Sequence, residues 1–460
     1  IDMFGNSTFY HIDPVTGKPR QIDSPPILSV GSEKALVQTK ASYDALGRKV
    51  LSIDANGQMT KTRFNFYGLP VEISYPDGSR EHFLYDKNGH LKSHIDSDGF
   101  AISYTWDLLG RLIKKEYGAS AAETFVYHGR RLSALTDKEN RTTRFEYDGA
   151  GRKILEETAG RKIHFGYDPI GMLAFERGSL HTVEYTRDLL NRVIEERILD
   201  PTGLVLQKTG YEYDADGNRI TIIHYPEGKI AKETFRYDGF GRLIEHRDAL
   251  GNLTTIAYDE QQKNALGQRV LTKTIVDPNR IATTFTYDPY YRQTSLQIGS
   301  QIAEKRRYDP VGNLLQMEKG GLLTSYGYDA HNRLRTSIRA DGTVQMRTTS
   351  YSYTSGGKLK TKTLPSGTVL FYTYDPFGHL ANLTSSDGKI AQTFTYTPNG
   401  HLLSASDGMH TLERRLDPFG NVLQETIDNR LTLWRTYDEE NRPLSITLPD
   451  KSSIRYLYDG

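Results

Sequence analysis

The chain has 460 residues and a formal net charge of +1, so it lacks a global field that would hold polyphosphate, and nucleic acid is not expected as the main partner. Hydrophobic residues make up 37%, which is low for a globular chain, whereas Tyr (30) and Gly (41) are abundant. The absence of Cys excludes disulfides, thiolate zinc sites and a cysteine nucleophile, and no stretch approaches the ~18 apolar residues of a membrane span.

Residues 1–42 come first in chain order, and we expect them to be a divergent or irregular start of the array that follows. Asp2-Met3-Phe4-Gly5-Asn6 already resembles a later loop, Asp417-Pro418-Phe419-Gly420-Asn421. Tyr458-Asp459-Gly460 stops inside another copy of the same motif. We therefore expect the array to be truncated at both ends.

Residues 43–460 carry one repeated motif: an aromatic residue, Asp, two variable residues, Gly, and usually Arg, His or Asn. Tyr43-Asp44-Ala45-Leu46-Gly47-Arg48 is the first clear copy. The first position of the motif, aromatic in all copies except those at Arg187 and Leu416, recurs at residues 43, 64, 85, 106, 127, 147, 167, 187, 213, 237, 258, 287, 308, 328, 353, 374, 396, 416, 437 and 458. Self-similarity at a fixed period is the signature of a repeat architecture, so we predict one continuous array of about twenty units.

A second turn lies between successive copies of the motif, as in Asp54-Ala55-Asn56-Gly57 and Pro76-Asp77-Gly78. Asp and Asn side chains accept backbone N–H groups within turns, and Gly supplies positive φ. The segments between turns, such as residues 389–396, are rich in Thr, Phe and Tyr, which favour strands. Each repeat is therefore predicted to be a β-hairpin, and the fold class is all-β.

Many motif aromatics follow another aromatic two residues earlier, as Tyr85 follows Phe83. This spacing places both rings on one face of the sheet, and we expect ladders of rings across the strands. About forty strands at ~4.8 Å would give an edge of roughly 190 Å, which an open twisted sheet does not tolerate without curling. A ring of that circumference would be roughly 60 Å wide, too wide for side chains to fill. The sequence thus predicts a long, curved sheet that is part of a hollow shell.

The signature and its period resemble the Rhs or YD-repeat family, which includes bacterial polymorphic toxins, the B and C components of Tc toxins, and the teneurins. The resemblance implies hairpins wound spirally into a hollow shell, which in the bacterial toxins encloses a toxic C-terminal segment. Many Rhs proteins also contain two Asp-Pro-x-Gly motifs about eighteen residues apart that perform self-cleavage. Here such motifs begin at Asp168, Asp309, Asp375 and Asp417, the closest pair 42 residues apart, so we interpret them as ordinary turns.

No sequence pattern predicts catalysis, and we expect no enzyme, no cofactor, no metal site and no catalytic residue. Asp214-Ala215-Asp216-Gly217-Asn218 superficially matches a calcium loop, but Tyr225 stands where the bidentate Glu belongs. His90 and His94 could share a strand face as metal ligands, yet His90 occupies the Arg position of the repeat. We interpret the loop as a hairpin turn and the two histidines as repeat variation.

The predicted function is a non-catalytic β-shell segment of a secreted bacterial Rhs-type toxin. Its expected partners are a toxin cargo polypeptide, either its own C-terminus or a partner chain, together with the remaining shell and delivery machinery. The alternative is an extracellular adhesion or recognition scaffold that binds a receptor or carbohydrate. Its contacts would then be expected in the enlarged loops near residues 199–210, 260–269 and 340–350, because loops on rigid scaffolds commonly carry binding.

Overall fold

The computed structural model describes residues 5–30, 34–118, 120–226, 229–340 and 346–458. Within these ranges the chain forms 41 β-strands and no helix. Consequently none of the described segments is a helix long and apolar enough to cross a membrane. The predicted all-β array of hairpins is confirmed. Of the repeat-like motifs at the two ends, residues 2–4 and 459–460 lie outside the described ranges.

The chain divides into two units, each assembled from segments far apart in the sequence. Unit 1 consists of Ile1–Ala101, Leu253–Tyr372 and Ser385–Asp387, and unit 2 of Ile102–Asn252, Thr373–Thr384 and Gly388–Gly460. Each unit therefore contains an early run of strands and a late run.

The early run of unit 1 contains β1 (Phe9–Ile12), β2 (Pro19–Leu28), β3 (Lys34–Tyr43), β4 (Lys49–Ile53), β5 (Met59–Phe64), β6 (Pro70–Ser74), β7 (Arg80–Tyr85) and β8 (Leu91–Ile95). Its late run contains β23 (Leu253–Asp259), β24 (Thr272–Val276), β25 (Ala282–Tyr287), β26 (Gln293–Ile298), β27 (Gln301–Tyr308), β28 (Leu314–Lys319), β29 (Leu322–Tyr328), β30 (Leu334–Ala340), β31 (Met346–Tyr353), β32 (Leu359–Thr363) and β33 (Val369–Tyr374).

The early run of unit 2 contains β9 (Ala101–Trp106), β10 (Leu112–Tyr117), β11 (Ala121–His128), β12 (Arg131–Thr136), β13 (Thr142–Tyr147), β14 (Lys153–Thr158), β15 (Arg161–Tyr167), β16 (Leu173–Arg177), β17 (Thr182–Arg187), β18 (Val193–Leu199), β19 (Val205–Tyr213), β20 (Arg219–His224), β21 (Ala231–Tyr237) and β22 (Leu243–Arg247). Its late run contains β34 (Leu380–Ser385), β35 (Ala391–Tyr396), β36 (Leu402–Ser406), β37 (Thr411–Leu416), β38 (Val422–Ile427), β39 (Leu431–Tyr437), β40 (Pro443–Thr447) and β41 (Ser453–Arg455).

Successive strands within a run pair antiparallel, so each repeat is a hairpin that hydrogen-bonds to the next. Strands β5 and β7 end at the motif aromatics Phe64 and Tyr85, and the pairing register shifts just before each aromatic. Such bulges add local twist to a strand pair. Residues 9–43 carry β1–β3 and pair in the same antiparallel manner.

The two motif aromatics of β7 share a face, and the residue directly opposite the first of them belongs to the second strand of the hairpin. In β7, Phe83 and Tyr85 are half-buried while His82 and Leu84 are exposed. Across the strand pair Phe83 faces His94, and the two rings stack with centroids 4.7 Å apart. At this hairpin the predicted ladder of aromatic rings is interrupted, because the second strand lies between the rings of successive repeats and its His94 stacks on Phe83.

The sheet has almost no conventional core. Among the described residues the buried hydrophobic side chains are Ile27, Val37, Val270 and Leu370, all in unit 1. Most other strand residues are half-buried on one face or exposed. The fold is thus held by contacts along the sheet and at its loop edges.

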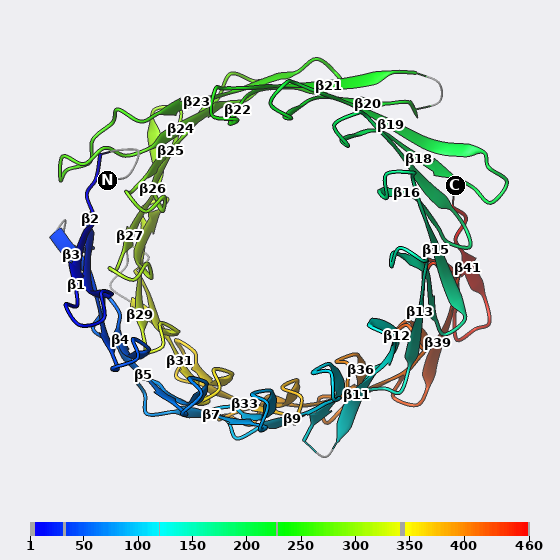
Figure 1. Cartoon of the computed structure of the whole chain (residues 1–460), viewed down its shortest axis with the longest axis horizontal. Helices are drawn as coiled ribbons and strands as arrows, with labels where there is room; N and C mark the ends of the chain where they lie inside the picture. Colours follow the sequence, from blue (N-terminus) through cyan, green and yellow to red (C-terminus); the bar gives the residue numbers. More distant parts are fainter. Residues whose placement is uncertain (1–4, 31–33, 119, 227–228, 341–345, 459–460) are drawn as a thin grey trace. The chain divides into compact units, whose positions relative to one another are not determined.

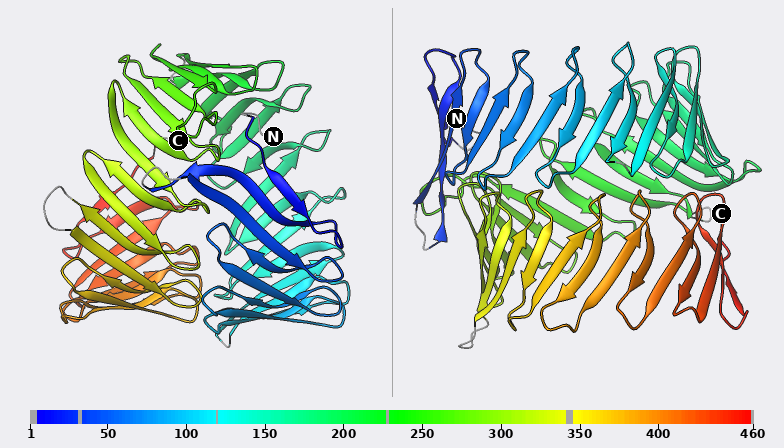
Figure 2. Two further views of the ribbon diagram at one scale, coloured as in Figure 1. Left: turned by 90° about the vertical axis from the view of Figure 1, so that its left-hand side faces the viewer. Right: turned by 90° about the horizontal axis from the view of Figure 1, so that it is seen from below.

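The two runs of each unit lie side by side. In unit 1 the early strands β2–β5 and the late strands β27–β31 occupy the same region of Figure 1, and the right-hand view of Figure 2 shows the blue run next to the yellow run with their loops facing. In unit 2 the cyan strands face the orange strands in the same way. The contacts along these facing loops define the candidate site described below.

The structure describes two of the enlarged loops of the adhesion alternative. The segment 199–210 joins the end of β18 to β19 through a turn at residues 200–204, of which residues 201–204 are exposed. The segment 260–269 is followed by Val270, which is 2% exposed, and its Gln268 side chain bonds to the Pro26 carbonyl of β2 at 3.0 Å. In the third, residues 341–345 lie outside the described ranges.

Gly166→Ala is expected to destabilise unit 2 by about 1–3 kcal/mol, because overpacking a well-filled contact forces neighbours to shift. Gly166 pairs with Phe175 across β15 and β16, and an added Cβ would overlap the Phe175 ring. Gly149→Ala is the control, since a Cβ there meets nothing within 4 Å. Urea unfolding of both variants checks this, and equal midpoints would contradict the packing argument.

Candidate functional site: repeat turns and the seam between runs

Each motif Asp organises its own turn. Asp329 accepts the backbone N–H groups of His331 and Arg333 through Oδ1, both at 2.9 Å, and the Arg333 Nε–H through Oδ2 at 2.7 Å. Burial alone would raise the pKa of Asp329, but the hydrogen bonds from Arg333 outweigh it and lower that pKa. Asn332, with φ of 61°, stands where most copies have Gly. The carboxylate thus fixes both the turn and the arginine side chain.

The clamped arginine then reaches the next repeat. Arg333 donates from Nη1 to the Thr354 carbonyl at 3.1 Å, and its guanidinium lies 4.9 Å from the centroid of the Tyr353 ring. In return the Tyr353 hydroxyl donates to the Leu334 carbonyl at 2.7 Å. Arginine stacks well on aromatic faces while its fork donates hydrogen bonds. Asp, Arg and Tyr of the signature therefore form one link between consecutive repeats.

The link recurs along the chain. Equivalent arginine-to-carbonyl bonds join Arg48 to Asn65, Arg131 to Asp148, Arg192 to Asp214 and Arg292 to Asp309. Equivalent tyrosine-to-carbonyl bonds join Tyr127 to Leu112, Tyr147 to Leu132, Tyr213 to Val193, Tyr308 to Gln293 and Tyr437 to Val422. The signature is thus explained by coupling between repeats.

The residues considered in the sequence as metal ligands or cleavage sites lie in repeat turns or in contacts beside them. His90 replaces the arginine, with Nδ1 3.1 Å from Asp86 Oδ2, and His94 contacts Glu81 at 3.1 Å. The calcium-like loop is a repeat turn in which the Asn218 amide donates to Asp214 at 2.9 Å. The four Asp-Pro-x-Gly motifs each close a turn through the Gly N–H and the Asp carbonyl. In the ranges that the structure describes, no three His, Asp or Glu side chains gather as a metal site.

The loop edges of the two runs meet in a seam, which we define as the contacts between second turns of an early run and motif turns of the late run. In unit 1 the Asn56 amide donates to Asp309 Oδ2 at 2.7 Å, and His331 Nε2 lies 2.8 Å from Asp77 Oδ2. One repeat further on, Asp98 Oδ1 accepts the Gly356 N–H at 2.6 Å. The three early residues are equally spaced in sequence and precede the Gly of their turns, so one position of each second turn makes the seam.

Asp77 shows the electrostatic character of the seam. Burial alone would raise its pKa, but hydrogen bonds from Ser79 and from His331 outweigh burial and lower the pKa to about 2. Arg333 Nη2 lies 3.6 Å from the same carboxylate oxygen. The Asp77 carboxylate is therefore held ionised between two basic groups of the late run.

The seam of unit 1 also has an apolar part. The Tyr290 hydroxyl donates to the Pro25 carbonyl at 2.6 Å, and burial raises the pKa of Tyr290 to about 12. Ile27 in β2 and Val270, at 1% and 2% exposure, are the most buried hydrophobic side chains among the residues that the structure describes. The Gln268 side chain, two residues before Val270, donates to the Pro26 carbonyl of β2, so the late run anchors β2.

Unit 2 has an equivalent seam with different side chains. The Asn399 amide donates to Asp137 Oδ2 at 3.0 Å, and its backbone N–H donates to Glu139 at 3.2 Å. Further along, His181 Nδ1 lies 2.8 Å from Glu440 Oε2. Arg141 donates to the Pro418 carbonyl. The turn-to-turn arrangement is thus common to both units, while the pairs of side chains differ.

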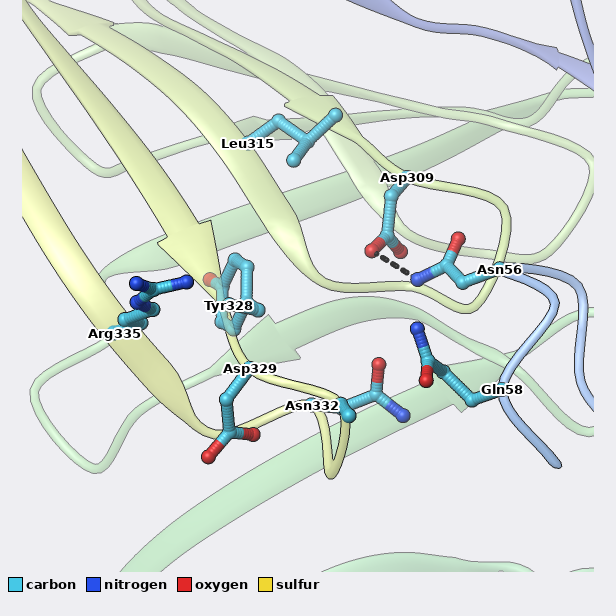
Figure 3. Close-up of a pocket in the computed structure, with 9 residues that line it drawn as sticks. Asn56, Gln58, Asp309, Leu315, Tyr328, Asp329, Asn332 and Arg335 are labelled. Atoms are coloured by element: carbon cyan, nitrogen blue, oxygen red, sulfur yellow. Dashed lines mark hydrogen bonds between the residues drawn. The ribbon is translucent and has the colours of Figure 1, made fainter. Parts of the chain in front are cut away.

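A cavity of about 520 Å³ lies at the seam of unit 1, between the turn at Asn56 and strands β28–β30 (Figure 3). Its lining residues are Asn56, Gln58, Asp309, Leu315, Tyr328, Asp329, Ala330, Asn332 and Arg335. Both carboxylates are committed to turn contacts, Asp309 to Asn56 and Asp329 to Arg333. The cavity is therefore a polar crevice between docked turns, and its two carboxylates hold the surrounding turns in place.

Sequence reasoning found the motif turns but missed the seam. The available signal was the recurrent Asp or Asn just before the Gly of the second turns, as at Asn56, Asp77 and Asp98. Asp and Asn in such turns can also hydrogen-bond to the backbone of their own turn, so the pattern alone did not indicate a distant partner.

The sequence is similar to known RHS-repeat proteins. A family model described as RHS Repeat matches residues 85–121 and 308–344. The chain is 24% identical over 488 residues to Double-stranded DNA deaminase toxin A of Burkholderia cenocepacia (strain H111), covering 92% of this chain and 31% of that protein. The predicted resemblance to the Rhs or YD-repeat family is thereby confirmed.

Solved structures share the fold. The crystal structure of TcdB2-TccC3 matches with a TM-score of 0.60 and 13% identity, covering 96% of this chain and 30% of that one. A Tc holotoxin pore from Photorhabdus luminescens matches with a TM-score of 0.54 and 12% identity, covering 94% and 31%. The chain thus spans about a third of the length of each of these proteins.

Arg333→Lys is expected to weaken the contact between two repeats by about 1–2 kcal/mol, because lysine cannot hold Asp329, the Thr354 carbonyl and the Tyr353 ring simultaneously. Hydrogen exchange should quicken at residues 329–333 and 354–358. Arg335→Lys is the matched control on the next strand, since Arg335 has no polar partner within the described ranges. Identical exchange in the two variants would contradict the link.

Acid is expected to weaken the seam of unit 1 through Asp77. Because its folded-state pKa of about 2 lies below the ordinary value of 3.8, ionised Asp77 stabilises the folded unit above 3.8, and this contribution is lost as the pH falls through about 2. Urea midpoints of wild type and Asp77→Asn should therefore differ most at neutral pH and converge in acid. A constant difference at all pH values would refute the assignment.

Proposed function

We propose that this RHS-repeat chain is a non-catalytic wall segment of a bacterial toxin, which encloses a toxic polypeptide and shields it until delivery. The observation that carries the proposal is the use of the signature side chains: they hold repeat to repeat, and the second turns hold run to run. The alignment of 92% of the chain with a protein named as a toxin supports the same role.

The physical properties of the sheet suit a wall. A sheet without a packed second layer encloses space with few residues per unit area, and the turn-to-turn seam closes the gap between neighbouring runs within each unit. Charged and polar side chains such as Arg80 and His82 lie among the exposed strand residues, so an enclosed polypeptide would meet a mixed surface and not a continuous hydrophobic one. Shielding would thus be steric, and the enclosed chain would be kept from stable folding.

The partners follow from this role. The enclosed polypeptide is either the toxin's own C-terminal segment or a partner chain, and further wall segments and delivery machinery complete the particle. The protein acts outside the producing cell, as a secreted or delivered toxin. Similarity to TcdB2-TccC3 and to a Tc holotoxin pore supports a wall that belongs to a larger assembly.

Protease protection tests the proposal in the native full-length protein. We expect the enclosed polypeptide to resist trypsin while the wall is intact, and electron microscopy to show internal space. Asp98→Lys should reduce protection several-fold, since it removes the acceptor of the Gly356 N–H and replaces a carboxylate that lies 3.6 Å from Lys358 Nζ with a positive charge.

Asp216→Lys is the charge-matched control, because Asp216 lies exposed at the tip of a repeat turn. Equal protection in both variants would contradict the sealing role of the seam. A solid particle without internal space, or binding of a receptor or glycan that accounts for activity without enclosed polypeptide, would overturn the proposal itself.

A further inference from the structure

One motif copy in the early run of unit 2 departs from its neighbours. Tyr127-His128-Gly129-Arg130-Arg131 has His in place of the Asp, and its last Arg follows the aromatic residue by four places, whereas Arg152 follows Tyr147 by five. In the structure β11 and β12 are joined by Gly129 and Arg130 alone. This turn is therefore one residue shorter than the next and has lost its carboxylate.

The link between repeats is complete without that carboxylate. Arg131 donates to the Asp148 carbonyl at 2.9 Å, and the Tyr147 hydroxyl donates to the Leu132 carbonyl at 2.9 Å. His128 and Arg130 take no part in the link. Both side chains are exposed, and neither has a polar partner in the ranges that the structure describes. Two basic groups of the shortened turn are thus free for another contact.

A cavity of about 730 Å³ lies beside the shortened turn. Strands β12 and β13 pair only between residues 134–136 and 142–144, so Ser133 and the turn before it stand apart from the end of β13. The cavity is lined by the turn, by Ser133 and by Phe145, Glu146 and Tyr147 of β13. Small-molecule sites commonly measure roughly 300–1,000 Å³, so the space suits a ligand of moderate size.

The lining offers three kinds of chemical group. The shortened turn supplies a basic end, and Glu146 supplies an exposed carboxylate that has no polar partner among the described residues. Phe145 and Tyr147 are half-buried, so part of each ring stays accessible. The carboxylates at the seam cavity of unit 1 hold turns together, whereas Arg130 and Glu146 hold nothing in this structure's described ranges.

We infer that this cavity binds a mononucleotide. Arg130 and His128 would hold the phosphate, because a guanidinium donates two parallel N–H bonds to phosphate oxygens. Glu146 would accept the ribose hydroxyls, as acidic residues do in dinucleotide sites. The base would stack on the ring of Phe145 or Tyr147, since every base presents a flat π-face to an aromatic side chain. A simple inorganic anion would leave the rings unused and would be repelled by Glu146.

The surroundings favour a single nucleotide over a nucleic acid strand. Binding along a strand requires a row of cations facing successive phosphates. Beside the cavity the charges alternate instead: Arg144 of β13 faces Glu157 of β14, which faces Lys162 of β15. This inference concerns a small-molecule site on one repeat and stands whether or not the wall encloses a polypeptide.

Isothermal titration calorimetry on the native full-length protein tests the inference, with adenosine and uridine 5′-monophosphates as probes. Arg130→Ala should weaken binding about tenfold or more, because it removes a charged hydrogen-bond donor. Arg144→Ala is the matched control, since Arg144 is exposed on β13 but lies outside the cavity lining. Adenosine and inorganic phosphate should each bind much more weakly than the monophosphates.

Three results of this titration would overturn the inference. The first is that neither monophosphate binds, and the second is that both arginine variants bind as wild type does. The third is that inorganic phosphate or a single-stranded oligonucleotide binds as tightly as the monophosphates. Circular dichroism verifies that each variant retains its strands.

Photolabelling provides a second readout that locates the site. 8-Azidoadenosine 5′-monophosphate is expected to label residues 128–133 or 145–147, as mapped by mass spectrometry, and excess adenosine 5′-monophosphate should prevent it. Glu146→Gln should weaken binding of adenosine 5′-monophosphate several-fold but leave that of its 2′,3′-dideoxy analogue unchanged. Labelling confined to other segments would refute the site, and equal weakening for both nucleotides would refute the role of Glu146.

Discussion

The structure depends on the carboxylate-to-arginine link that each repeat makes with the next. A sheet with few buried hydrophobic residues cannot rely on layered packing, because most of its apolar surface stays in contact with water. Asp329 shows the alternative: it fixes its turn and aligns Arg333, which binds the following repeat. Stability then accumulates from neighbour to neighbour, as in other repeat proteins.

The arginine of the motif is replaced in some repeats by a residue that still contacts the turn Asp. His379 contacts Asp375 at 2.9 Å, and Asn313 donates to Asp309 at 2.7 Å, each from the arginine position. Both replacements keep the contact within the turn and still reach the next repeat: Asn313 donates to Asn332 Oδ1 at 2.8 Å, and the His379 ring lies 5.1 Å from the Tyr396 ring. Variation at this position therefore changes the kind of contact between repeats and keeps the shape of the turn.

The sequence predicted the local structure well because its causes are local. Tyr-Asp-x-x-Gly-Arg contains the whole turn, and the alternation of turns predicted two strands per repeat. The seam could not be derived, since His331 and Asp77 lie about 250 residues apart and meet only after many strands have added their twist. The predicted ring ladder is interrupted at Phe83 for a simpler reason: His94 of the neighbouring strand stacks on that ring.

The spacing of seam partners has a consequence for how such arrays evolve. Tandem repeats gain and lose units by unequal recombination, and in most repeat proteins one unit more or less disturbs only its neighbours. Here the loss of a single hairpin between Asp77 and His331 would shift the pairs by one place, and Asp77 would then face the turn of Gly356 instead of that of His331. Selection should therefore act on the number of units between partners, so that length changes survive only outside that interval or in compensating pairs.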